Sequence, residues 1–146
     1  MLRRDYDGQN CSIARALEVV GERWTLLIVR DAFLGRRRFD EFQASLGVSR
    51  NVLTERLNRL VEEGILDRVL YQERPERYEY RLTKKGRDLH LALTALRQWG
   101  DDYLSDKPPR LLRSKADRKP VIAALIPKGQ PHLRVEEVES IPGPGR

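Results

Sequence analysis

Glycines divide the first half of the chain into segments whose apolar residues follow a helical spacing. Gly21, Gly35, Gly47 and Gly64 each follow such a segment, and glycine is a common residue just beyond a helix end. Apolar residues three and four positions apart form one face of a helix. The sequence therefore predicts four short helices that pack through these faces, over 12–20, 22–34, 39–46 and 49–63.

The third and fourth of these helices are separated by a very short connection. Residues 47–50 form a joint that begins with glycine, and Ser49 is placed to cap the following helix by accepting a hydrogen bond from a free backbone N–H. Two helices joined in this way are typical of a helix-turn-helix motif, whose second helix enters the major groove of DNA.

Beyond Gly64 the apolar period changes from that of a helix towards that of a strand. Two segments, 65–71 and 78–82, alternate like antiparallel strands, with Pro75 in a loop at about 72–76. Thr83 is then placed to cap a last long helix that ends near Leu104. The predicted fold is mainly α with a small β-hairpin wing, a winged helix-turn-helix.

The composition excludes several classes of protein. The chain has 146 residues, one cysteine and two histidines, which rules out an internal disulfide framework and leaves little material for a metal site or a Cys/His catalytic pair. Its longest apolar run, Val121 to Ile126, is far shorter than a membrane span. We therefore predict a cytoplasmic binding protein, not an enzyme, with no cofactor and no membrane partner.

Charge and proline content both mark a boundary after Asp106. Residues 1–106 carry 19 Lys and Arg against 18 Asp and Glu, whereas residues 107–146 carry 9 against 4 and hold seven of the eight prolines. Proline-rich segments do not continue helices. We predict a winged-helix domain over 1–106 and a basic, proline-rich extension over 107–146, in which 120–126 and 132–138 pair as a small hairpin.

The helix after the joint carries polar residues on the face opposite its leucines. Arginine can bond guanine, asparagine can bond adenine, and threonine can contact either with its hydroxyl or methyl group. Arginines before the motif and at the hairpin tip suit phosphate and minor-groove contacts. The alternative for each group is an ordinary solvated surface. The candidate DNA-binding residues are Arg36, Arg37, Arg38, Ser49, Arg50, Asn51, Thr54, Asn58, Arg74 and Arg77.

Several stretches carry a resemblance to a known family. They include the runs Gly21-Glu22-Arg23-Trp24-Thr25-Leu26-Leu27-Ile28, Leu53-Thr54-Glu55-Arg56-Leu57 and Glu63-Gly64-Ile65-Leu66, together with Cys11, Gly86 and Trp99. Over about residues 11–104 the chain resembles the HxlR-type, MarR-like transcription regulators of bacteria, although Ser12 stands where that family usually has a proline. The resemblance implies a homodimer that binds inverted-repeat operators in double-stranded DNA.

The last predicted helix has a broader apolar stripe than a small domain needs for its own core. Together with the family resemblance, this stripe indicates a homodimer interface. The alternative is that the stripe packs within one chain. The candidate interface residues are Leu17, Val20, Leu93, Leu96, Trp99 and Tyr103.

Cys11 is the candidate regulatory residue. It stands at the start of the first helix, where the helix dipole favours a thiolate. In some HxlR-like proteins a cysteine at this place reacts with quinones, aldehydes or oxidants, so the resemblance implies a small-molecule or electrophile effector. The alternative is a small buried residue that fills the dimer core.

One other function stays open on the sequence. A winged-helix module could bind another protein without sequence-specific DNA binding, and it would lack the steep salt dependence that phosphate contacts produce. An enzyme is disfavoured because the chain has no glycine-rich phosphate loop and no nucleophile elbow.

Overall fold

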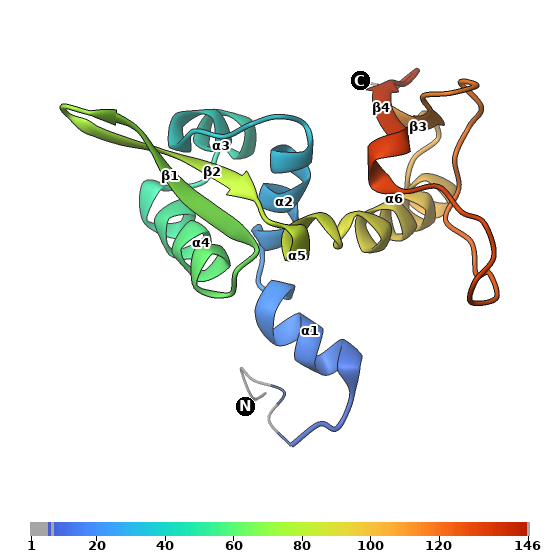
Figure 1. Cartoon of the computed structure of the whole chain (residues 1–146), viewed down its shortest axis with the longest axis horizontal. Coiled ribbons are helices and arrows are strands. Elements are labelled where there is room, and N and C mark those ends of the chain that lie inside the picture. Colours follow the sequence, from blue (N-terminus) through green and yellow to red (C-terminus); the bar gives the residue numbers. More distant parts are fainter. Residues whose placement is uncertain (1–5, 7, 146) are drawn as a thin grey trace. The chain divides into compact units, whose positions relative to one another are not determined.

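The computed structural model of the chain describes residue 6 and residues 8–145 (Figure 1). The chain forms two compact units, 1–87 and 88–146. This division falls earlier than the predicted boundary after Asp106, because the helix that follows Asp88 packs on the C-terminal extension. Within the described residues, no helix is long and apolar enough to cross a membrane.

Four helices of the first unit form in the segments that the glycines delimit. They are α1 (Ser12–Val20), α2 (Thr25–Phe33), α3 (Phe39–Leu46) and α4 (Arg50–Glu62). Gly47 and Gly64 take the left-handed backbone conformation that ends a helix, with φ at 66° and 72°. The second helix begins later than predicted because the preceding turn holds Trp24 in the left-handed region, at φ 80°.

A compact apolar core holds the helix-turn-helix, α3 and α4, against α2. Burial of each large apolar side chain contributes about 1.5–3 kcal/mol. The core therefore fixes which face of α4 points outward. Its fully or almost fully buried members are Ile28, Val29, Phe42, Leu53, Leu57, Leu60, Ile65 and Leu66.

The hairpin predicted after Gly64 is present. Its strands, β1 (Leu66–Glu73) and β2 (Glu76–Leu82), pair antiparallel and extend beyond α3 and α4 to a tip (Figure 1). The strands pair up to residues 73 and 76, so the loop is shorter than the predicted 72–76. The register shifts at Tyr71, where one strand carries an extra residue.

Thr83 caps the helix after the hairpin as predicted, but that helix is interrupted. Its Oγ1 accepts a hydrogen bond from the N–H of Gly86 at 3.0 Å, within the one-turn helix α5 (Lys84–Arg87). Two residues then separate α5 from α6 (His90–Leu104). The prediction of one continuous helix was wrong here, because α5 is held against the start of the hairpin through Gly86.

The second unit combines α6 with a small antiparallel sheet of β3 (Arg110–Ser114) and β4 (Val138–Pro142), preceded by the 3-10 helix η1 (Val135–Glu137). The predicted hairpin between 120–126 and 132–138 is wrong. The N–H and carbonyl of Ala123 bond the side-chain amide of Gln98 on α6, at 3.0 and 3.1 Å. These backbone groups are satisfied without a strand partner, and the sheet forms between more distant segments.

Candidate nucleic-acid interface

The outer face of α4 is polar, and three of its side chains point to solvent without a partner in the described part of the chain. Asn51, Thr54 and Asn58 are exposed, while the leucines of the same helix lie in the core. None of these three side chains has a hydrogen-bond or ion-pair partner among the described residues. Their amide and hydroxyl groups are therefore available to an external partner, as base contacts in a major groove require.

The start of α4 is fixed by two side chains from the predicted set. Ser49 Oγ accepts a hydrogen bond from the N–H of Val52 at 3.3 Å, which caps the helix and leaves the hydroxyl proton free to donate. The guanidinium of Arg50 lies over the ring of Phe39, the first residue of α3, at 4.7 Å from its centroid. This cation–π contact holds Arg50 beside the helix terminus while its N–H groups can still donate.

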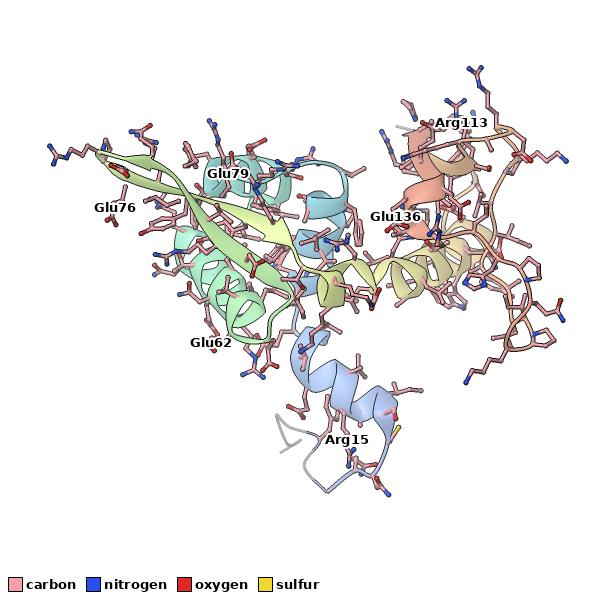
Figure 2. The ribbon with its side chains drawn as sticks, viewed as in Figure 1. Arg15, Glu62, Glu76, Glu79, Arg113 and Glu136 are labelled. Carbon is pink, nitrogen blue, oxygen red and sulfur yellow. The ribbon has the colours of Figure 1, made fainter. Side chains whose placement is uncertain are left out.

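The three consecutive arginines before α3 occupy different environments. Arg36 lies 3.6 Å from the carboxylate of the fully buried Asp31, and Arg38 lies over the ring of Tyr71 at 4.4 Å. Arg38 also approaches Glu79, labelled in Figure 2, at 3.9 Å. Among the described residues, the exposed guanidinium of Arg37 has no such partner. Arg37 is thus the arginine of this loop best placed to contact a phosphate.

The wing packs on the helix-turn-helix through one face and carries cations at its tip. Tyr80 meets the edge of Phe42 with ring centroids 6.5 Å apart, and burial raises the pKa of its phenol while nearby Arg68 acts in the opposite direction. Arg74 and Arg77 are exposed at the tip. Glu76, labelled in Figure 2, lies there too, so the tip is not uniformly basic.

Two wing residues that belong to this surface were absent from the predicted set. Arg68 lies over the ring of Tyr78 at 3.9 Å from the opposite strand. The alternation of side-chain directions along β1 could have identified Arg68 from the sequence. Tyr71, whose ring contacts the guanidinium of Arg38, lies at the bulge of β1. No local sequence signal predicts that shift in register.

An ion-pair network ties α4 to the turn that precedes α2. One guanidinium nitrogen of Arg56 lies 2.9 Å from Glu22 and 3.2 Å from Glu55, and its Nε donates to the carbonyl of Arg23 at 3.0 Å. Arg56 therefore offsets part of the negative charge that Glu55 would present to a phosphate backbone. Arg56 was not among the residues predicted for this surface.

The predicted interface and regulatory residues differ in exposure. Leu17, Leu96, Trp99 and Tyr103 are exposed, with Tyr103 at 73%, whereas Val20 is buried and Leu93 is partly covered. The Trp99 and Tyr103 rings lie 5.6 Å apart on successive turns of α6.

Cys11 is the exposed N-cap residue of α1. Arg15, one turn along α1 (Figure 2), directs its guanidinium towards the side-chain carbonyl of Asn10 at 3.5 Å. The positive charge of Arg15 is therefore engaged with Asn10.

The fold and the polar face of α4 define a class of protein, the helix-turn-helix transcriptional regulators. The described part of the chain holds no cluster of three His, Cys, Asp or Glu side chains suited to a metal ion. A model of the HxlR-like helix-turn-helix family matches residues 19–108. The chain belongs to this family, as its resemblance predicted, and the family consists of transcriptional regulators, not enzymes.

Comparison with individual proteins gives the same class. The chain is 54% identical over 114 residues to the helix-turn-helix-type transcriptional regulator Rv3095 of Mycobacterium tuberculosis, covering 77% of this chain and 71% of that protein. The crystal structure of PA1607, a candidate transcription factor, superposes with a TM-score of 0.73 at 44% identity, covering 84% of this chain and 87% of that one. The oxidised redox regulator HypR superposes with a TM-score of 0.58 at 30% identity, covering 63% and 96%.

Proposed function

We propose that this transcriptional regulator binds an inverted-repeat operator as a homodimer, with one α4 helix in the major groove of each half-site. The observation that carries the proposal is the outer face of α4, where Asn51 and Thr54 are exposed and unpartnered beside the anchored Arg50. Arg37 and the wing arginines Arg74 and Arg77 would contact phosphates or the adjacent minor groove.

The experiment that tests this function is a selection from fragmented DNA of the source genome with the reduced full-length protein at moderate salt. We expect the recovered fragments to share an inverted repeat whose half-sites lie about one helical turn apart. We also expect the affinity for that repeat to fall steeply as salt rises. Folded protein that enriches no sequence would contradict the proposal and favour the protein-binding module.

Exposed apolar side chains on α6 support the homodimer. Leu96 and Trp99 are both 55% exposed, and Leu104 is 75% exposed. On α1, Ile13 is 71% exposed. Exposed apolar side chains that cluster on one helix of a small domain usually mark a surface that binds another protein. A second copy of the chain is the partner that an inverted-repeat operator requires.

Substitution Trp99→Glu should convert the dimer to a monomer. A central aromatic residue contributes about 2 kcal/mol or more to an interface, so the dimer dissociation constant should rise by at least about 30-fold. Sedimentation velocity over a range of protein concentrations measures this change. The matched control is Leu125→Glu, which places the same charge at a fully exposed leucine outside the proposed interface and should leave the dimer intact. A Trp99→Glu variant that remains dimeric would refute this interface.

We further propose that electrophiles regulate DNA binding through Cys11. The thiol is exposed at the start of α1, where a soluble reagent can reach it. HypR, similar in structure to this chain, is a redox regulator, which supports the same kind of control here. The thiolate would add to a ring carbon of a quinone, forming a C–S bond as the C=C π bond of the ring opens. The electron pair passes to a carbonyl oxygen, which takes up a proton, and the product is a hydroquinone thioether.

Variant Cys11→Ser should bind the operator as well as the wild type does and should lose the response to benzoquinone. Wild-type affinity should change by about tenfold after treatment, the size of an ordinary allosteric coupling. Fluorescence anisotropy before and after treatment measures both quantities. The control Ser12→Ala retains the thiol and should retain the response. An unchanged response in Cys11→Ser would exclude this residue as the sensor.

A further inference from the structure

The second unit contains a pocket that neither the DNA interface nor the proposed dimer interface uses. It has a volume of about 390 Å³ and lies between one face of α6 and the β3–β4 sheet with the segment that follows β3. Its lining residues all fall between 94 and 141, so the pocket is complete within one compact unit. This volume is within the range of small-molecule sites.

The pocket is rich in arginine. Four arginines and two aspartates line it. Arg113, labelled in Figure 2, is paired with Glu139, and Arg110 donates to the hydroxyl and carbonyl oxygens of Ser140 at 3.0 and 2.9 Å. Those contacts hold the two guanidiniums of β3 in place and leave part of the donor set of Arg110 unused.

Arg97 on α6 has a donor atom that lacks a partner. Its Nη1 is buried and makes no hydrogen bond within the described residues. Burial lowers the pKa of Arg97, nearby Asp101 raises it, and the positive charge of Arg110 lowers it further. A buried N–H without an acceptor beside a second guanidinium is costly for the protein alone. A bound anion would provide the missing acceptor and offset the repulsion between the two cations.

The rest of the pocket favours a ligand with an apolar body and a single charge. Leu112, Val121 and Ile141 contribute apolar surface from β3, the following segment and β4. Asp101 and Asp102 also line the pocket, and their charge opposes a multiply charged anion such as a phosphate monoester.

One further residue of the lining has an uncommon backbone conformation. Arg118 lies in the left-handed region at φ 60°, where glycine or asparagine is the usual residue. The Arg118 side chain is part of the pocket lining.

We propose that this pocket binds a small organic monocarboxylate, with the carboxylate on Arg97 and Arg110 and the apolar body against Leu112, Val121 and Ile141. Arginine is suited to such a site because its planar group bonds a carboxylate through two parallel N–H donors. The pocket thereby gives the C-terminal extension a ligand-binding function separate from the thiol on α1.

The test is calorimetric titration of the full-length protein with 2-naphthoate and with its neutral isostere, 2-naphthamide. We expect naphthoate to bind with one site per chain and at least tenfold more tightly than the amide. Arg97→Gln should weaken naphthoate binding by at least tenfold. Lys128→Gln removes the same charge from an exposed turn outside the pocket and should leave binding unchanged.

A second variant keeps the test decisive if Arg97→Gln fails to fold. Ile122 lines the pocket and is 72% exposed, so Ile122→Trp can narrow the pocket without disturbing the core and should also abolish binding. Equal affinity for acid and amide would overturn the proposal, and so would the absence of naphthoate binding at millimolar concentration. The titration contains no DNA, so its failure would leave the DNA-binding proposal standing.

Discussion

Replacing Asn51 with alanine should lower affinity for the operator by about 10- to 100-fold, the effect of losing a bidentate contact to a base. Asn51 is exposed in the first turn of α4 and its side chain has no partner among the described residues. The substitution therefore removes no contact that holds the fold. Fluorescence anisotropy with a labelled operator from the genomic selection measures the change.

Two control experiments distinguish sequence-specific base contacts from non-specific binding to DNA. A duplex of scrambled sequence should bind the wild type and Asn51→Ala equally, because phosphate contacts carry no sequence information. Glu62→Gln changes an exposed residue at the other end of α4, labelled in Figure 2, and should leave discrimination between the two duplexes intact. If Asn51→Ala still prefers the operator as strongly as the wild type does, α4 is not the reading element.

Replacing Gly86 with alanine should destabilise the winged-helix unit by about 1–3 kcal/mol, the usual cost of overpacking. A Cβ at this position would lie 2.2 Å from the carbonyl oxygen of Ile65 and 3.0 Å from a methyl carbon of Leu82. The carbonyl cannot move away cheaply, because it accepts the N–H of Thr83 at 3.0 Å. Urea denaturation followed by circular dichroism measures the loss.

Gly100 provides the matched control, since it also lies in a helix. Apart from its chain neighbours and the backbone of its own helix, no atom of the described residues lies within 4 Å of a Cβ built there, and its φ is not in the left-handed region. Alanine at Gly100 should therefore raise the stability by up to about 1 kcal/mol through helix propensity. A Gly86→Ala variant as stable as the wild type would show that the close approach between α5 and Ile65 is not required.

The sequence predicted the exposed polar side of α4 because that side follows from local periodicity. Once Leu53, Leu57 and Leu60 are assigned to the core, Asn51 and Thr54 must lie on the opposite side of the helix. Ser49 was found in the same way, since its hydroxyl bonds an N–H only three residues away. Assignments of this kind need no knowledge of the rest of the fold.

No local rule of this kind could predict that the three arginines before α3 have different partners. Arg36 pairs with a carboxylate on α2. Arg38 lies over the ring of a tyrosine at the bulge of the wing. Both partners come from other elements, and only Arg37 remains open to a phosphate.

The sequence by itself determined the order of the helices, the helix-turn-helix joint and the wing, because glycines, caps and periodicity act over a few residues. Only the tertiary structure decided that β3 pairs with β4 across residues 115–137 and that Gln98 binds the backbone of Ala123. Which distant segments pair as strands depends on the total burial and hydrogen bonding of the packed chain. These contributions arise only from tertiary contacts, so the local sequence does not contain them. The arginine-lined pocket has the same origin, since its walls come from segments up to 47 residues apart, Thr94 to Ile141.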